Sequence, residues 1–345
     1  MGKLRFSGRK IMKNLLGKTA LVALSLSFAG EAMATEWNVS VWGSRRAFTE
    51  HVEKLAELVS AKTNGEFTLS LGYGTLSKNK ENLDGISIGA FEMAQICAGY
   101  HADKNPTLTV LELPFIGVST LAQEVAVSNA VYQHPATVAD LARWNAKLLM
   151  PSPMPQYNLV GVGDPAATLD KFNGMRVRAT GGIGKAFSAV GAVPTSVTAT
   201  EAYNAMESGV VDTVAFAQHA HFAYRTIDIA EWWTENLNPG TVNCPVVVNT
   251  DAYAALTDAE REALDSSVEE AVQHYVDNYE QNVLSKWETV LTEKNVKKVV
   301  LEDSVIAEFR EKAAGPIRDE WIATMEGQGI PGQELYDLVQ TTLNK

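Results

Sequence analysis

Apolar and polar positions follow two different spacings along this chain. Residues 37–42 alternate between apolar and polar side chains, as a half-buried strand does, whereas Val52, Leu55 and Val59 recur at helical spacing within residues 48–62. The same two spacings predict a strand at residues 67–71, a helix at 82–89 and a strand at 92–97. Strands and helices that alternate in this order predict a parallel sheet covered by helices.

A second stretch of the same kind begins near Leu148. Thr198 and Glu201 stand three residues apart, the spacing of a capping box, and so predict the start of a helix that ends at Gly209. The other elements of this stretch are a helical turn at 168–172, a helix at 181–190, and strands at 175–178, 192–197 and 210–216. The fold class is therefore α/β, and its two units merge without a Pro- or Ser-rich linker.

The C-terminal third of the chain has a helical pattern. Thr257 and Glu260 form another capping box, and no helix breaker follows until about Glu293. A helix of that length would measure roughly 50 Å, more than one small domain, so we expect it to brace two domains. Residues 301–344 predict two more short helices, separated by a segment that contains Gly327, Gly329 and Pro331.

The N-terminus has the three parts of a secretory signal peptide. Residues 3–18 carry six Lys or Arg side chains, residues 19–30 are largely apolar, and Ala32-Met33-Ala34 offers small residues where a signal peptidase cuts. The apolar run is much shorter than the ~20 residues of a membrane span. Residues 1–34 are therefore predicted to be a signal peptide for export to the periplasm; a buried helix or a retained anchor is the alternative.

Charge limits the partners of the remaining chain. Residues 1–34 hold six of the 29 basic and one of the 41 acidic side chains, so without them the formal charge falls from −12 to −17. Such a surface repels nucleic acid and anionic lipid, and neither is an expected partner. It also repels anionic solutes, so any anion site has to be locally basic. About 310 residues predict two domains.

Two cysteines, Cys97 and Cys244, lie in apolar runs. Two separate buried thiols are the interpretation that this pattern favours. A disulfide is the alternative, since the expected compartment is oxidising.

Four segments, in the same order, resemble motifs of the solute-binding proteins of TRAP transporters. They are residues 85–94 (GISIGAFEMA), 113–115 (LPF), 169–178 (LDKFNGMRVR) and 200–212 (TEAYNAMESGVVD). They lie between residues 85 and 212, and the resemblance is expected to cover the whole chain after residue 34. The resemblance implies two α/β domains around a ligand cleft, with a long helix spanning both.

The resemblance also implies a function. Such a protein closes around a small organic anion and delivers it to the membrane subunits of a TRAP permease, without a cofactor and without catalysis. Strands exchange between domains in this family, so we expect one domain from residues 35–155 with about 244–283 and another from about 156–243 with 284–345. We expect a monomer. A ligand sensor for a membrane receptor is the alternative, and an exported enzyme is a weaker one, because the chain has no H-E-x-x-H motif.

Arg178 is the first candidate for ligand binding. It ends a predicted strand just before Gly181, where a helix begins and where free backbone N–H groups favour an anion. Its planar guanidinium can hold a carboxylate through two parallel hydrogen bonds, and the matching Arg of the family does so. Arg176 is interpreted as a surface residue. The Gly-rich run 181–184 lacks the spacing of a nucleotide-binding loop.

Phe216 departs from the family pattern. The family usually has Asn at this position, and its keto-acid branch has an aromatic residue with an acidic neighbour that helps bind a metal. The neighbour here is Ala215. The departure predicts a ligand with an apolar or aromatic body and no metal in the site; packing of Phe216 in the core is the alternative.

His219 and His221 stand two apart in a segment interpreted as a strand, where they would face the same way. Such a pair is able to ligate zinc, but no third ligand with a clear spacing is present. Contact of His219 with the ligand is a stronger hypothesis than a metal site; packing or hydrogen bonding inside the fold is the alternative.

Further candidates follow predicted strands, where open α/β sheets place their ligand-binding loops. Trp42, Arg45 and Arg46 follow the first strand, and Tyr100 follows the third. One of the two arginines would neutralise a second charge on the ligand; a surface position is the alternative for either. Tyr100 and Trp233, which follows Trp232, are predicted as cleft walls; core packing is the alternative for the tryptophans.

Overall fold

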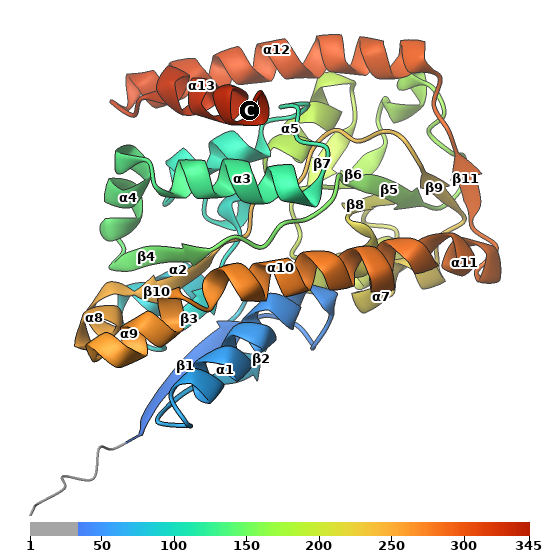
Figure 1. Ribbon diagram of the computed structural model, residues 1–345. Coiled ribbons are helices and arrows are strands. Elements are labelled where there is room, and N and C mark those ends of the chain that lie inside the picture. The colour runs from blue at the N-terminus through green and yellow to red at the C-terminus, as the bar shows by residue number, and fades with distance from the viewer. Residues whose placement is uncertain (1–33) are drawn as a thin grey trace, which may run out of the picture. The chain divides into compact units, whose positions relative to one another are not determined.

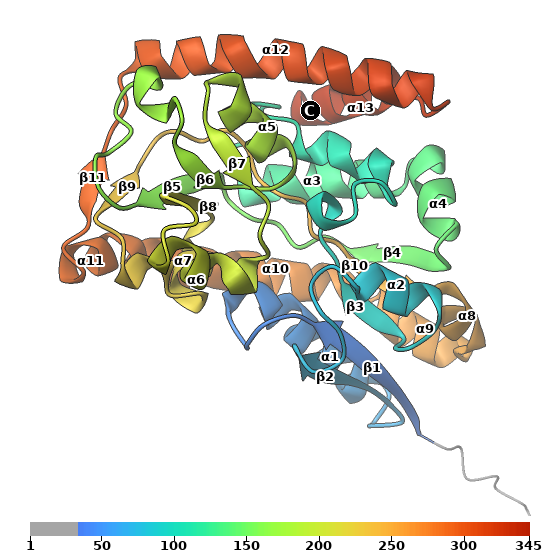
Figure 2. The same cartoon turned by 180° about the vertical axis from the view of Figure 1, so that it is seen from behind.

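The computed structural model describes residues 34–345, so the predicted signal peptide lies outside the described residues except for Ala34. Two β-sheets organise residues 34–345, and helices cover both (Figures 1 and 2). The first sheet has the order β2-β1-β3-β10-β4, with β1 Thr35–Val41, β2 Phe67–Tyr73, β3 Met93–Gln95, β4 Ala146–Met150 and β10 Val246–Asn249. The second has the order β11-β9-β5-β8-β6-β7, with β5 Asn158–Gly161, β6 Arg176–Arg178, β7 Val193–Thr195, β8 Thr213–Phe216, β9 Trp232–Thr234 and β11 Lys297–Val299.

Helices connect these strands. The α-helices between residues 34 and 255 are α1 Glu50–Lys62, α2 Asn82–Ser87, α3 Leu121–Tyr132, α4 Pro135–Ala142, α5 Gly181–Ala189, α6 Ala202–Glu207, α7 Gln218–Ala223 and α8 Thr250–Ala255. The C-terminal ones are α9 Asp258–Asp265, α10 Val268–Tyr279, α11 Ser285–Glu293, α12 Asp303–Gly327 and α13 Gly332–Leu343. Three short 3-10 helices matter for the site, namely η1 Ala47–Thr49, η2 Ala98–Tyr100 and η3 Pro106–Glu112.

The first sheet is built around β1, which pairs in parallel with β2 and β3. Val39 and Val41 are fully buried because they alternate onto the face that α1 covers with Val52 and Leu55. Each such buried aliphatic side chain contributes about 1.5–3 kcal/mol. The strand–helix alternation predicted for residues 37–97 is confirmed.

One strand of the first sheet comes from much later in the chain. β10 inserts between β3 and β4 and is antiparallel to both. The second unit was expected to begin near Leu148, but this residue lies in β4, at the edge of the first sheet, and the second sheet begins with β5. The expectation was wrong because local spacing predicts a strand and not the sheet that it joins.

The second sheet confirms the strands predicted at residues 175–178, 192–197 and 210–216. β6 lies between β7 and β8, parallel to both, and β5 is antiparallel to β8 and β9. β11 joins the far edge beside β9. The domain boundaries expected above remain a prediction.

The long C-terminal helix is interrupted once. α9 ends at Asp265, where Ser266 and Ser267 break the expected run, and Ser267 Oγ donates a hydrogen bond to the carbonyl of Ala263. Serine hydroxyls compete in this way for backbone groups, which explains the break. α10, a π-helical segment at Glu280–Leu284 and α11 then follow without a gap.

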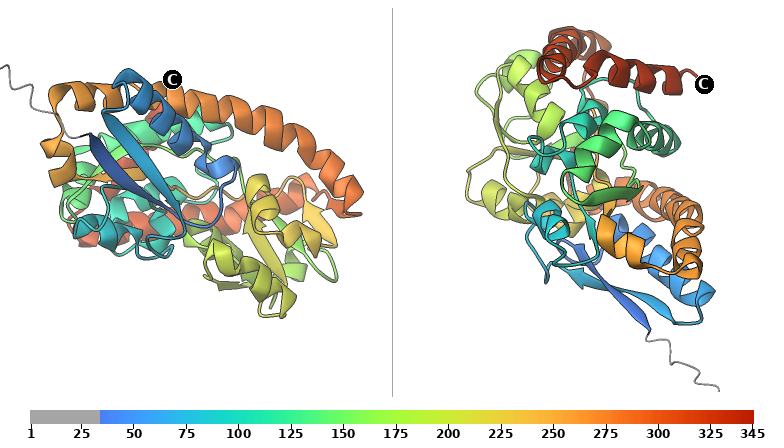
Figure 3. Two further views of the ribbon diagram at one scale, coloured as in Figure 1. Left: turned by 90° about the horizontal axis from the view of Figure 1, so that it is seen from below. Right: turned by 90° about the vertical axis from the view of Figure 1, so that its left-hand side faces the viewer.

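The α10–α11 run packs on elements of both sheets. Its stretches of 12, 5 and 9 residues measure about 40 Å together. Near its start Tyr275 lies 5.0 Å from the ring of His51 in α1, and near its end Trp287 lies 4.8 Å from Trp233 in β9. The run extends alongside both sheets in Figures 1 and 3. The predicted brace is confirmed, at a shorter length.

α12 corrects the expectation of two short helices near the C-terminus. It has 25 residues and continues through the exposed Pro316. Its buried positions recur every four residues, and one of them, Phe309, packs its ring 5.2 Å from Phe115 and 5.7 Å from Phe187 of α5. This packing stabilises the helix despite the proline. No helix within residues 34–345 combines the length and the apolar character that a membrane span requires.

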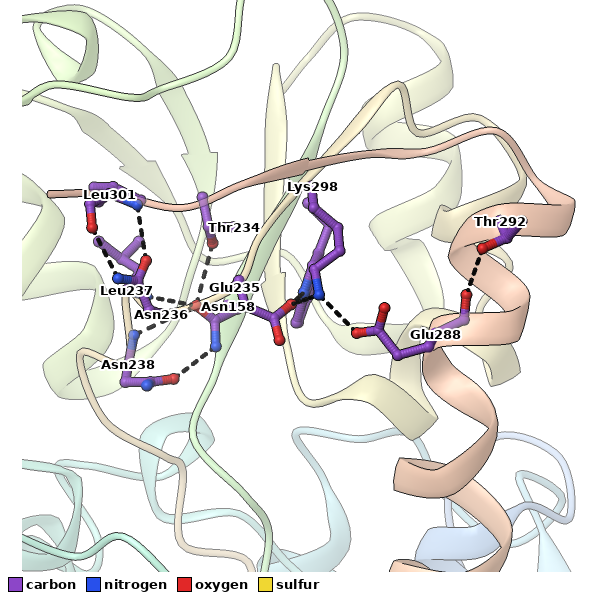
Figure 4. A network of polar contacts seen from close by, with 11 residues as sticks. Asn158, Thr234, Glu235, Asn236, Leu237, Asn238, Glu288, Thr292, Lys298 and Leu301 are labelled. Atoms are coloured by element: carbon purple, nitrogen blue, oxygen red, sulfur yellow. Dashed lines mark hydrogen bonds and ion pairs between the residues drawn. The ribbon is translucent and has the colours of Figure 1, made fainter.

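A polar network ties the second sheet to the C-terminal segments (Figure 4). Asn158 Oδ1 at the start of β5 accepts hydrogen bonds from Thr234 Oγ1 and from the backbone N–H of Leu237. Lys298 of β11 donates to Glu288 of α11. The Asn158 contacts hold the start of β5 beside β9, and the Lys298 contact holds β11 against α11.

Candidate functional site

A cavity lies where strand ends and loops of both sheets meet, as expected for an open α/β fold. It encloses about 40 Å³, room for the centres of roughly three water molecules. Six of its side chains are Trp, Phe or Tyr. The lining residues are Trp42, Arg46, Phe48, Cys97, Gly99, Tyr100, Glu112, Met154, Tyr157, Arg178, Thr180, Ala199, Phe216, His219, Ala220, Tyr224, Val242 and Cys244.

Arg178 lies in this cavity at the end of β6 and is only 2% exposed. Its Nε donates to the carbonyl of Val197 at 3.0 Å, and its Nη2 donates to the hydroxyl of Tyr100 at 3.1 Å. The guanidinium lies 4.4 Å from the ring centre of Phe216. Arg176, two residues earlier, alternates to the surface and pairs with Asp212, as expected for a strand.

Tyr100, the last residue of η2 after strand β3 of the first sheet, holds Arg178 in place. Its hydroxyl oxygen accepts hydrogen bonds from Arg178 and from the backbone N–H of Ala199 at 2.9 Å. Both of these partners are donors, so the hydroxyl hydrogen of Tyr100 is free to be donated into the cavity.

Arg46 is the second cation of the cavity. Its Nη1 donates to the carbonyl of Trp42 at 2.6 Å, but its buried Nε and Nη2 have no partner among residues 34–345. The guanidinium lies 5.5–5.7 Å from the ring centres of Trp42, Phe48 and Tyr224.

Neither arginine of the cavity forms an ion pair with a carboxylate of the described chain, whereas the exposed Arg45, Arg176 and Arg225 all do. Desolvated cations without a counter-charge are costly. The arrangement therefore favours an anion in the cavity.

The two histidines do not form the expected pair. Residues 218–223 form helix α7 and not a strand, and two residues along a helix point to different sides. His219 lines the cavity and its Nδ1 lies 2.7 Å from the hydroxyl of Tyr279, whereas Nδ1 of His221 lies 2.7 Å from Thr226 Oγ1. Burial holds the pKa of His219 well below its usual range, so the ring is neutral. Within residues 34–345 no three His, Cys, Asp or Glu side chains come together as a metal-ligand set.

Two predicted site residues lie away from the cavity. Arg45 is exposed and pairs with Glu53 of α1, because the chain turns after β1 and sends only Arg46 inward. Trp233 is 1% exposed and packs against Trp287, so the alternative of core packing holds for it.

Gly181 is also absent from the cavity wall. It begins α5 at a φ of +55°, and a Cβ there would lie 1.9 Å from Oε2 of Glu112. Its role in the structure is to let the start of α5 approach that carboxyl group.

The sequence reasoning missed Phe48, Glu112, Tyr157 and Tyr224. Phe48 is the only one with a local signal, since it follows the first strand as Arg46 does. Burial raises the pKa of Glu112 to about 7. Nothing in the local pattern distinguishes Glu112 from an ordinary surface glutamate.

The two cysteines form a disulfide, which overturns the interpretation as separate thiols. Cys97 follows β3 and Cys244 precedes β10, and these strands are neighbours in the first sheet. The bond forms because the pairing of β3 and β10 brings the two residues together, and it lies in the cavity wall.

The fold is that of a solute receptor, and the chain belongs to the family described as "Bacterial extracellular solute-binding protein, family 7", whose profile matches residues 39–323. It is 24% identical over 273 residues to the C4-dicarboxylate-binding periplasmic protein of Rhodobacter capsulatus. This alignment covers 77% of this chain and 80% of that protein. It is also 24% identical over 201 residues to a solute-binding protein of Sulfitobacter sp. (strain NAS-14.1), over 57% of this chain and 60% of that one.

Solved structures share the fold. A TRAP solute-binding protein from a marine metagenome, specific for aromatic acids and bound to metahydroxyphenylacetate, has a TM-score of 0.81 at 20% identity over 90% of this chain and 98% of that one. A Bordetella pertussis extracytoplasmic solute receptor that binds pyroglutamic acid has a TM-score of 0.78 at 20% identity, over 89% of this chain and all of that one.

The resemblance to TRAP-transporter solute-binding proteins is thus confirmed, together with the α/β fold. The protein is a solute-binding component of transport, and the role of its family is to capture a solute and deliver it to a membrane permease.

Proposed function

We propose that this protein binds an organic acid with one carboxylate and a flat apolar or aromatic body, and that Arg178 anchors the carboxylate. The observation that carries the proposal is the combination of two arginines without a carboxylate partner, Arg178 and Arg46, and six aromatic walls around one small cavity.

The carboxylate is expected beside Arg178. The guanidinium offers a planar fork, and the hydroxyl of Tyr100 offers a further donor on the same side. Because Val197 and Phe216 hold the guanidinium from two directions, it needs little reorganisation to receive the ligand.

The body of the ligand is expected among the rings. Phe216, in place of the family's usual Asn, lies under Arg178, and Trp42 and Phe48, which follow the first strand, line the same cavity. Such walls suit ring stacking. The relative specific for aromatic acids is consistent with this ligand class.

A dicarboxylate is the second candidate. Arg46 has two buried donors without a partner, which is what a second carboxylate would fill, and one relative is a C4-dicarboxylate-binding protein. The two candidates differ in their need for aromatic walls, so a panel of acids separates them.

We further propose that the ligand bridges two domains. Trp42, Arg46 and Tyr100 follow strands of the first sheet, and Arg178 and Phe216 end strands of the second. A ligand that contacts both sets binds the closed state more tightly and so shifts the protein toward it. The protein acts as a monomer in the periplasm, is exported by residues 1–34, catalyses no reaction and partners the membrane subunits of a TRAP permease.

The test is a thermal-shift screen of protein purified from the periplasm and stripped of ligand by unfolding and refolding. The panel holds 3-hydroxyphenylacetate, benzoate, succinate, pyroglutamate and glucuronate. A ligand at 100 times its Kd adds about 2.7 kcal/mol of stability, a shift of several degrees. A shift with the aromatic acids that disappears in Arg178→Met and survives in Arg176→Met supports the proposal. A shift with succinate alone favours the dicarboxylate, and no shift with any acid refutes the ligand class.

A further inference from the structure

Glu112 is a buried acid in the cavity wall with half of its hydrogen-bonding capacity unused. It is 1% exposed at the end of η3. Its Oε1 accepts hydrogen bonds from the backbone N–H groups of Gly99 at 3.0 Å and Asn243 at 3.1 Å, whereas its buried Oε2 has no partner within residues 34–345. A buried polar atom without a partner is rare in a folded protein.

Two glycines lie against the carboxyl group of Glu112, and a third lies against its backbone carbonyl. A Cβ would lie 2.9 Å from Oε2 at Gly99, 1.9 Å from Oε2 at Gly181 and 1.8 Å from the Glu112 carbonyl at Gly182. Real Cβ atoms essentially never show contacts below 3.0 Å. The backbone of η2 and the backbone at the start of α5 are therefore able to approach Glu112 only because these three positions lack side chains.

The charge state of Glu112 follows from this environment. Its pKa is raised to about 7 by burial, and neither Arg178 nor Arg46 forms an ion pair with it. Because both N–H donors bind Oε1, that oxygen is the carbonyl-like one, and the proton of the neutral acid belongs on Oε2.

Other ionisable groups near Glu112 do not supply a compensating charge. Glu124 of α3 is buried, and burial together with the charge of Glu112 raises its pKa to about 8. Tyr157 lines the same cavity, and burial raises its pKa. Asp103 and Lys185 line a second cavity that Glu112 also lines, and Lys185 pairs there with Glu320 of α12.

We propose that Glu112 is a proton-coupled ligand contact. When the ligand is bound, Oε2 of Glu112 carries a proton and donates a hydrogen bond to an acceptor on the body of the ligand. This proposal rests on the proposed function. A carboxylate held by Arg178 in the same cavity disfavours a second negative charge on Glu112, so the pKa of Glu112 rises further on binding. Binding therefore takes up a proton.

The sign of the pH dependence follows. Affinity is full below the pKa of the ligand-free protein, about 7, and falls as the pH rises through it, by up to tenfold per unit. Between pH 6 and pH 8.5 the Kd rises roughly ten- to thirtyfold.

The experiment is calorimetric titration of 3-hydroxyphenylacetate into the purified protein at pH 6, 7 and 8.5, in pairs of buffers with different ionisation enthalpies. Wild type takes up a fraction of a proton at pH 7 to 8.5, and its Kd rises as stated. In Glu112→Gln the ratio of Kd at pH 8.5 to Kd at pH 6 falls to about one. Glu124→Gln removes a buried acid that interacts with Glu112 but lies outside the cavity wall, and it keeps a rise of Kd between pH 6 and pH 8.5.

A second measurement needs no ligand. The infrared carbonyl-stretch band of a protonated carboxyl, recorded for the ligand-free protein at pH 6 and at pH 8.5, loses intensity with rising pH in wild type and lacks that component in Glu112→Gln. Binding with a flat pH profile in wild type, or an infrared band unchanged by Glu112→Gln, overturns the proposal and leaves the proposed function intact. If no acid of the panel binds, the proposed function fails and the proton linkage fails with it.

Discussion

Replacement of Arg178 by Met separates ligand binding from folding. The side chain donates hydrogen bonds to the protein at 3.0, 3.1 and 3.4 Å, yet its charge has no carboxylate partner within the described chain. A ligand carboxylate supplies that partner. Two charge-assisted hydrogen bonds contribute about 1.5–3 kcal/mol each, so we expect Arg178→Met to raise the Kd by roughly 150-fold or more.

The same substitution is expected to change the stability of the ligand-free protein little. Methionine has a similar length and removes a buried, unpaired charge, which stabilises the fold. The carbonyl groups of Val197 and Ala215 lose a donor, which offsets that gain. The net change in the free energy of unfolding is therefore expected within about 2 kcal/mol.

The assay combines calorimetric titration of 3-hydroxyphenylacetate with urea unfolding of the ligand-free protein. Arg176→Met is the matched control, because Arg176 lies on the same strand and pairs with Asp212 at the surface. It is expected to keep the wild-type Kd and to lose at most about 1 kcal/mol of stability. A Kd for Arg178→Met within threefold of wild type would refute the reasoning, and so would an equal loss of binding in the control.

Three further predictions concern the disulfide, a buried histidine and the aromatic wall. Reduction, or the double change Cys97→Ser and Cys244→Ser, opens a loop of 147 residues and should lower the free energy of unfolding by about 2–5 kcal/mol, and an unchanged melting temperature under reductant would contradict the bond. Burial lowers the pKa of His51 to about 3, so stability should fall as the pH drops from 6.5, where only the unfolded chain takes up the proton. By pH 4.5 the free energy of unfolding should fall by about 2–3 kcal/mol. The variant His51→Gln is able to keep a hydrogen bond to Ser152, and its urea unfolding should lack this part of the pH dependence. Phe216→Leu keeps an apolar side chain but loses the ring beside Arg178, so the Kd for 3-hydroxyphenylacetate should rise about two- to tenfold with little change for succinate, and equal losses for both acids would argue against a ring–ligand contact.

Much of the local structure is predictable from the spacing of apolar residues. The strands at 37–42 and 210–216 and the helix at 48–62 follow from it directly. This spacing does not predict which sheet each strand joins. β10 joins the first sheet beside β4, although about 95 residues separate the two strands in the chain, and β11 likewise joins the second sheet from a distant part of the chain. Such pairings depend on long-range packing.

The candidate site also contains residues that the local sequence pattern predicts and one that it does not. Arg178, Phe216, Trp42 and Tyr100 end or follow strands, and the structure places them at one cavity as expected from their position. Glu112 depends on glycines that lie 13 and about 70 residues away, which no local pattern reveals.

Two misjudged features have the same origin. The spacing of His219 and His221 has a different meaning on a strand and on a helix, and the short apolar run around them allowed both interpretations. The cysteine pair needed the neighbouring positions of β3 and β10, although two cysteines in a chain predicted to be exported already allowed a disulfide.

The position of the carboxylate in a crystal structure of the protein grown with 3-hydroxyphenylacetate tests the central claim most directly. The account predicts that both carboxylate oxygens lie within hydrogen-bonding distance of the Arg178 guanidinium and that the ring lies between Phe216 and Trp42. A carboxylate bound elsewhere, or a ligand outside this cavity, would contradict it.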